Sequence, residues 1–290
     1  MRFLPVLLAA CSSDVPEALS PDEAVAAVQA PGSHPVGHAR FTLDTVQLGT
    51  GADRSLPVEV WYPATEASSS AAVYSVAGLV NITSTVATVE PPPVTGPLPV
   101  AVYSHGSGGV AAVGFDYAEH LASHGWIVVA PDHVGNTTLD VLSGGLSYIQ
   151  SAMDRPLDVS AVLDALEAGI DVPFEPQTDQ VLLVGHSFGG FTSLVSAGVQ
   201  IDLDQLDRFC PPGADDPDCL LLDDPGVIQA IDDRRFTDPR IAAIVPQAPA
   251  ALAFAAGSVT ALDQPVLLMS GARDRTTPNP ENARAVFGDL

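Results

Sequence analysis

The stretch VLLVGHSFGGF, residues 181–191, decides the fold of this chain. Its first four residues are all apolar, which predicts a strand buried on both faces of a parallel sheet. Gly185, Ser187 and Gly189 then match the G-x-S-x-G pattern of a nucleophile elbow, a sharp turn between a strand and a helix. Such a turn exposes the serine hydroxyl and directs the N–H of Phe188 toward a developing oxyanion. The alternative is a glycine-rich turn whose serine has no chemical role.

A second glycine-rich segment follows another apolar run. Residues 98–104 predict a buried strand, and they lead directly into HGSGG at residues 105–109. This segment resembles the HG-x-G loop of lipases and esterases, in which a loop N–H is the second oxyanion donor. The resemblance assigns that donor to the N–H of Ser107. A flexible glycine turn is the alternative.

The order of the predicted elements indicates the fold class. A helix over residues 117–125, a strand over residues 126–133 and a helix over residues 156–166 separate the two motifs, with Pro156 in the first turn of the second helix. Strands that alternate with helices predict a parallel sheet covered on both faces. Residues 64–97 show no steady period and predict no regular element.

Three segments together carry a family resemblance. Residues 104–109, 121–128 and 185–190 resemble the α/β-hydrolases, and within them the bacterial esterases similar to dienelactone hydrolases and platelet-activating-factor acetylhydrolases. The polyester-hydrolysing cutinase-like enzymes are related. The resemblance covers about residues 40–290. It implies an α/β-hydrolase fold, with a mostly parallel sheet, helices on both faces and a small acidic lid insertion. It also implies ester chemistry without a cofactor or metal.

The resemblance also assigns the acid of the catalytic triad. In these hydrolases the acid follows a strand with a G-x-x-D pattern, which here is the predicted strand 265–271 and Asp274. The alternative is that Asp274 caps the helix that begins near Pro280.

The triad order of this fold requires a histidine after the acid. All seven histidines precede Asp274: His34, His38, His105, His120, His124, His133 and His186. His133, at a strand exit, is the one candidate for a substitute base. We therefore expect a C-terminally truncated hydrolase that lacks the last strand, the last helix and the catalytic histidine.

An acidic segment interrupts the pattern after the elbow helix. Residues 198–238 contain many aspartates and are predicted to form a solvated lid over the site. After Asp202 the segment lacks the glycine and glutamate positions of an EF-hand, so no calcium site is predicted. Cys210 and Cys219 lack zinc-site spacing and are expected to form a disulfide, which indicates an oxidising compartment.

Charge and the N-terminus indicate where the protein acts. The formal net charge is −24, and such a surface repels nucleic acid, so a nucleic-acid partner is excluded. Residues 8–11 resemble a lipobox, which predicts a signal segment at 1–11, lipid modification of Cys11, a linker at 12–38 and a hydrolase domain at 39–290. An unmodified Cys11 is the alternative. We expect a cell-envelope or extracellular lipoprotein that contacts a membrane only through this anchor.

These observations favour a serine carboxylic-ester hydrolase that acts through an acyl-enzyme on Ser187. Short-chain or phospholipid-like small-molecule esters are the first expected substrates, and polyesters are the second. A non-catalytic surface lipoprotein that binds a ligand on a degenerate hydrolase fold is the rival from another class. A dienelactone hydrolase is a further rival, but that enzyme uses a cysteine nucleophile and this chain has Ser187.

Overall fold

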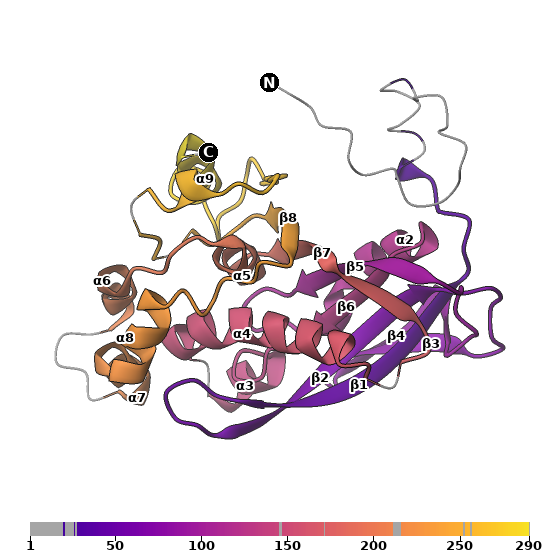
Figure 1. Ribbon diagram of the computed structural model, residues 1–290, viewed down its shortest axis with the longest axis horizontal. Helices are drawn as coiled ribbons and strands as arrows, with labels where there is room; N and C mark the ends of the chain where they lie inside the picture. Colours follow the sequence, from indigo (N-terminus) through magenta and orange to yellow (C-terminus); the bar gives the residue numbers. More distant parts are fainter. Residues whose placement is uncertain are drawn as a thin grey trace.

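One eight-stranded sheet forms the centre of the molecule. The computed structural model describes residues 20, 26, 28–144, 147–170, 172–210, 216–251, 253–255 and 257–289. The strands are β1 (Val36–Val46), β2 (Asp53–Pro63), β3 (Ala71–Val76), β4 (Val80–Val89), β5 (Pro97–Ser104), β6 (Ile127–Pro131), β7 (Glu175–His186) and β8 (Ile241–Gln247). Their order across the sheet is β3-β4-β1-β2-β6-β5-β7-β8 (Figure 1).

The half of the sheet that holds both glycine motifs is parallel. β6, β5, β7 and β8 all run in the same direction, and Ser104 of β5 is paired with Gly185 of β7. The loops that follow these strands therefore leave the sheet at one edge, where α/β proteins build their sites. The other half is mixed, since β2 is antiparallel to both β1 and β6. The prediction of a mostly parallel sheet is confirmed.

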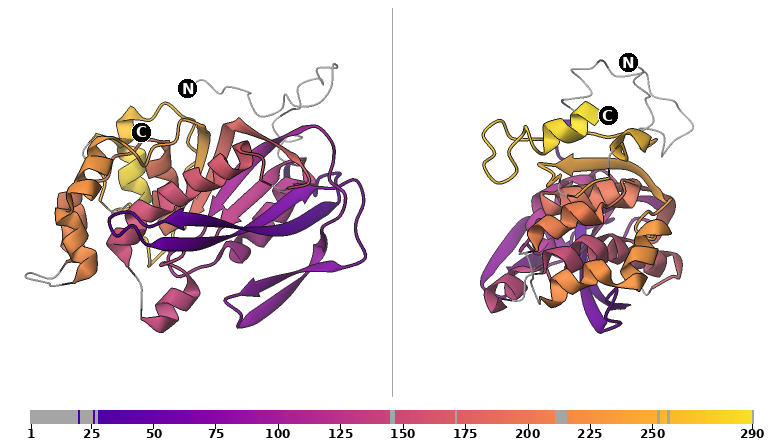
Figure 2. Two further views of the ribbon diagram at one scale, coloured as in Figure 1. Left: turned by 60° about the horizontal axis from the view of Figure 1, so that its bottom comes forward. Right: turned by 90° about the vertical axis from the view of Figure 1, so that its left-hand side faces the viewer.

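Helices cover both faces of the sheet, as predicted. The longer helices are α2 (Phe115–Ser123), α4 (Tyr148–Glu167) and α5 (Phe188–Ala197). Alternate residues of β5 point to opposite faces: Val100 and Val102 pack with α4, whereas Ala101 packs with α2. Figure 2 shows the twisted sheet between these layers. Both faces are therefore buried, as the apolar runs require.

Two local predictions are wrong. No regular element was predicted for residues 64–97, but β3 and β4 form an antiparallel hairpin there, at the edge of the sheet. Pro156 does not begin its helix, because α4 starts at Tyr148 and contains Pro156 in its interior. The earlier start is stabilised from outside, since the Asp218 carboxylate accepts hydrogen bonds from the N–H groups of Ile149 and Gln150.

The acidic insertion is a set of packed short helices. Its elements are α6 (Leu203–Leu206), η2 (Asp207–Phe209), α7 (Pro217–Leu220), η3 (Leu221–Asp223) and α8 (Pro225–Asp232). They gather at one end of the molecule (Figure 1). Asp202, Asp216 and Asp224 are the N-caps of α6, α7 and α8, so part of the acidic composition serves helix capping rather than solvation alone.

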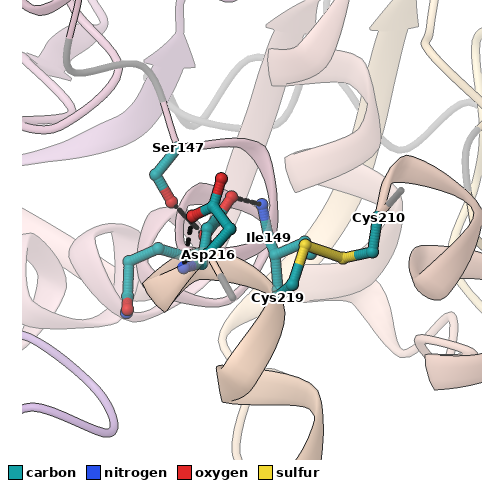
Figure 3. Close-up of a disulfide and its surroundings, with 7 residues drawn as sticks. Ser147, Ile149, Cys210, Asp216 and Cys219 are labelled. Carbon is teal, nitrogen blue, oxygen red and sulfur yellow. Dashed lines mark hydrogen bonds between the residues drawn. A yellow bond between two sulfur atoms is a disulfide. The ribbon is translucent and has the colours of Figure 1, made fainter. Parts of the chain in front are cut away.

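The predicted disulfide is confirmed. Cys210 and Cys219 are joined, with their Cα atoms 5.7 Å apart. The same insertion supplies Asp218, whose carboxylate also accepts from the hydroxyl of Ser147, the N-cap of α4. Figure 3 shows Ser147 and Ile149 at the start of α4 beside the disulfide. The insertion is thus fastened to α4 by side-chain caps next to the crosslink.

The structure describes only part of the N-terminal segment for which predictions were made. The signal segment 1–11 and Cys11 lie outside the described residues, as does most of the segment 12–27. The predicted linker ends earlier than residue 38, because the N–H groups of Gly32 and His34 donate to Ser123 of α2. In the described part of the chain, no helix is long and apolar enough to cross a bilayer.

Candidate active site

The strand-to-helix turn at Ser187 has the geometry of a nucleophile elbow. Ser187 links β7 to α5 with φ 55° and ψ −114°, a left-handed backbone conformation that costs energy in a residue other than glycine. Its N–H donates to Gln247 O at 2.8 Å, and its carbonyl accepts from the N–H of Ala250 at 3.0 Å. The strained turn is therefore held by the last residue of β8 and by the chain that follows it. The side chain is partly exposed.

The two glycines of the motif permit this turn by close backbone approach. A Cβ at Gly189 would lie 2.6 Å from the carbonyl carbon of Ser104 and closer still to its oxygen. A Cβ at Gly185 would lie 2.8 Å from the nitrogen of Gly190. Any side chain at either position would push α5 away from the sheet. Close packing thus explains why glycine occupies both positions of the pattern.

The glycine-rich loop after β5 lies directly against Ser187. A Cβ at Gly106 would be 3.3 Å from Cβ of Ser187, so the loop approaches the elbow too closely for a side chain to fit easily between them. The N–H groups of Ser107 and Phe188 have no hydrogen-bond acceptor among the described residues. An oxyanion hole requires N–H groups that are free to donate to the developing oxyanion, and both of these N–H groups are free in that sense. The oxyanion-donor roles of Ser107 and Phe188 stay predictions.

Asp274 lies near the elbow but serves a turn. The segment before it runs parallel to β8, with bridges from Val266 to Ile244 and from Met269 to Gln247, where a full strand was predicted. The Asp274 carboxylate accepts hydrogen bonds from the N–H groups of Thr276 and Thr277 and from the Thr277 hydroxyl.

These bonds have an electrostatic consequence. Hydrogen bonds from Thr277 and Thr276 hold the pKa of Asp274 below its usual range, and the nearby His186 adds a smaller charge effect in the same direction. The Thr277 hydroxyl also donates to Ala248 O at 3.1 Å, next to the chain that holds Ser187. Asp274 is therefore an ionised carboxylate that caps a turn, and its catalytic role stays a prediction.

The hypothesis that His133 is the base for Ser187 is wrong. His133 is fully buried, and its two ring nitrogens are occupied by Ser104 Oγ and by Asp158 Oδ2, each at 2.9 Å. His105 is also fully buried, whereas His186 is exposed. No histidine ring is hydrogen-bonded to Ser187 in the described part of the chain.

Sequence reasoning missed the buried polar groups behind the glycine loop. Arg155 of α4 is 1% exposed and donates to the carbonyl of His105. The arginine lies fifty residues from the loop in sequence, within a helix whose start was misplaced, so no local pattern could reveal this contact.

Among the described residues, no cluster of three or more His, Cys, Asp or Glu is arranged to hold a metal ion.

Comparison with solved structures identifies the fold of the chain. The chain is similar in structure to the ferulic acid esterase of Streptomyces cinnamoneus, with a TM-score of 0.62 and 21% sequence identity. The match covers 91% of this chain and 73% of that one. The chain has the α/β-hydrolase fold. The predicted fold class is confirmed.

A family comparison covers the segment that contains the two glycine motifs. The family model described as Chlorophyllase matches residues 67–207, a little under half of the chain. The matched segment contains Ser107 and Ser187 but ends before Asp274. No curated protein sequence matches the chain. The predicted relationship to α/β-hydrolase esterases is confirmed, although the matching family model is not one of the esterase groups named from the sequence.

Proposed function

We propose that this α/β-hydrolase cleaves carboxylic esters through an acyl-enzyme on Ser187. The observation that carries the proposal is the close approach of the glycine loop to the elbow at Gly106 and Ser187, together with the lack of a hydrogen-bond acceptor among the described residues for the N–H groups of Ser107 and Phe188. The family model and the neighbouring esterase support ester chemistry.

The proposed reaction has two steps. The Ser187 oxygen forms a bond to the acyl carbon, the two N–H groups stabilise the resulting oxyanion, and the bond to the alcohol oxygen then breaks. Water attacks the acyl-enzyme in the same way and releases the acid. The serine proton passes to a base and then to the leaving alcohol. We assign no residue of this chain to that base.

Apolar side chains border the two donor residues and support an apolar acyl group. Val141 is 45% exposed and lies against Gly108 of the glycine loop. Tyr148 is 44% exposed, with its ring centroid 6.3 Å from that of Phe188. We propose short-chain or phospholipid-like esters as the first substrate class and polyesters as the second.

The test is hydrolysis of p-nitrophenyl acetate by the 290-residue chain with and without imidazole in solution, since imidazole can act as the base. We expect turnover that rises with imidazole and is lost in Ser187→Ala, while Ser55→Ala, an exposed serine on β2, keeps it. Residual catalysis without a base is expected at ~10³–10⁴ over water. Equal hydrolysis by wild type and Ser187→Ala at every imidazole concentration would refute the proposal.

A second candidate function is ligand binding without catalysis. It is favoured by the finding that no histidine ring is hydrogen-bonded to Ser187 in the described residues. If a p-nitrophenyl ester binds and its acyl group is never transferred to the protein, ligand binding is supported. If the acyl group is transferred to Ser187, hydrolysis is supported.

A further inference from the structure

A second chain of serine, histidine and aspartate lies behind the glycine loop. Ser104 Oγ is 2.9 Å from His133 Nε2, and His133 Nδ1 is 2.9 Å from Asp158 Oδ2. The bonding order is that of a catalytic triad, but Ser104 and His133 are 0% exposed and Asp158 is 1% exposed. Since no substrate reaches a fully buried hydroxyl, this chain has a role other than nucleophilic attack.

The hydrogen bonds fix where the protons lie. Burial raises the pKa of Asp158 to about 6, against the opposing effect of Arg54, which donates to it at 2.6 Å, so the carboxylate is ionised at neutral pH. His133 therefore donates from Nδ1 to Asp158 and accepts at Nε2. Ser104 then donates its hydroxyl proton to His133. Burial lowers the pKa of His133 well below its usual value, with Arg155 and Arg54 adding to that effect, so the ring is neutral. Each hydrogen bond between Ser104, His133 and Asp158 therefore has a defined donor and a defined acceptor.

Arg155 joins this chain to the glycine loop. Its guanidinium donates to Ser104 Oγ at 3.4 Å, to Asn136 Oδ1 at 3.3 Å and to the carbonyl of His105. Burial lowers the pKa of Arg155 to about 9, against the opposing effect of Asp158, so the group is charged at neutral pH. It forms no ion pair among the described residues. A buried cation without a direct counterion is costly, which points to a specific role.

The contacts of His105 set the direction of the Ser107 N–H. His105 Nε2 accepts from the N–H of His133 at 3.1 Å, so the ring proton is on Nδ1, which donates to Gly106 O at 2.7 Å. In a trans peptide the carbonyl and the following N–H point in opposite directions. Holding Gly106 O therefore holds the N–H of Ser107, and Arg155 holds the preceding carbonyl.

The same arginine contacts the residue of the other proposed donor. The guanidinium carbon of Arg155 lies 4.9 Å from the centre of the Phe188 ring, in cation–π geometry. Phe188 is 3% exposed, so its ring is confined between Arg155 and the apolar cluster of α4 and α5. One side chain thus touches both the glycine loop and the start of α5.

We propose that Arg155 is a positioning residue that aligns the N–H groups of Ser107 and Phe188, and that Asp158, His133 and Ser104 hold Arg155 in place. This inference rests on the proposed function for its catalytic consequence but not for its structural one. Arg155 touches no reacting atom, and it acts through the backbone of the loop and the ring of Phe188.

The structural arm of the test needs no substrate. The first variant is Arg155→Lys, which keeps the positive charge but loses the planar guanidinium and its several N–H donors. The second is Ser104→Ala, which removes the hydrogen bond to His133 with little change in side-chain volume. Arg235→Met, an exposed arginine, is the control. We expect the amide ¹H–¹⁵N resonances of Ser107 and Phe188 to shift and broaden in both variants and to stay unchanged in the control. If Arg155→Lys and Ser104→Ala both fold and their Ser107 and Phe188 amide resonances match those of the wild type, the proposal is overturned.

The kinetic arm uses p-nitrophenyl acetate at a fixed imidazole concentration. We expect kcat to fall about 10- to 100-fold with KM changed less than about twofold, because donors displaced from an oxyanion lose part of the ~10²–10³-fold effect of a lost donor. Unchanged kcat with a lowered Tm would show a merely structural role and overturn the proposal. If Ser187→Ala matches wild type, the proposed function fails, and the amide resonances still decide the positioning role.

Discussion

Gly189→Ala tests the close approach on which the elbow depends. The added Cβ would lie 2.6 Å from the Ser104 carbonyl carbon and 2.9 Å from His105 O. Both atoms are backbone at the end of a central strand, so no side chain can turn away. The closest atom is Ser104 O, nearer than either of these, so β5 and α5 must separate by about 1.5 Å to restore ordinary contacts.

The magnitude follows from that separation. Overpacking costs ~1–3 kcal/mol in general, and a backbone clash places this variant at the upper end, about 3 kcal/mol. For a chain of this size the loss corresponds to a Tm lower by about 6–12 °C. The assay is thermal unfolding followed by circular dichroism, together with Ser187-dependent turnover, which should fall because the Phe188 N–H moves with α5.

The matched control is the same substitution in open space. Gly288 lies in α9 (Ala283–Asp289), and a Cβ there would meet nothing within 4 Å. Gly288→Ala should leave Tm unchanged or raise it slightly, since alanine favours a helix over glycine by ~0.5–1 kcal/mol. A Gly189→Ala protein that unfolds within about 2 °C of wild type, with turnover intact, would refute the packing argument.

Three further predictions concern the insertion and the acid. Cys210→Ser with Cys219→Ser should lower the unfolding free energy by about 2–3 kcal/mol, measured in urea, because the crosslink closes a short loop. Asp218→Ala should cost about 1–2 kcal/mol and speed proteolysis of residues 198–238, since α4 loses its external cap, while the exposed Asp223→Ala should not. Asp274 should titrate below pH 3.8 by carboxyl ¹³C NMR, so its contribution to stability is present above that pH and lost as the pH falls further. Thr277→Val should raise this pKa, and an unchanged titration would contradict the assignment.

The features predicted correctly are those whose cause is local in sequence. The elbow could be predicted because Gly185 and Gly189 each lie two residues from Ser187. At that spacing the strand and the helix pass so closely that neither position can hold a side chain. The disulfide could be predicted because its two cysteines close a loop without other candidate partners nearby.

The features missed depend on distant residues. The start of α4 depends on Asp218, which caps it from the insertion about seventy residues later. The β3–β4 hairpin was missed because several of its apolar residues, such as Val80 and Val86, are exposed and break the two-residue period. The network of Ser104, His133, Asp158 and Arg155 comes from β5, the loop after β6 and α4, and only the folded chain brings it together.

The central claim, an acyl-enzyme on Ser187, is tested most directly by mass spectrometry. The chain is incubated with p-nitrophenyl acetate and imidazole, quenched in acid, and digested. We predict one added acetyl group on the peptide that contains Ser187, absent from Ser187→Ala and removed after longer incubation in buffer. Acetyl groups found only at other residues, or in equal amount on Ser187→Ala, would contradict the account.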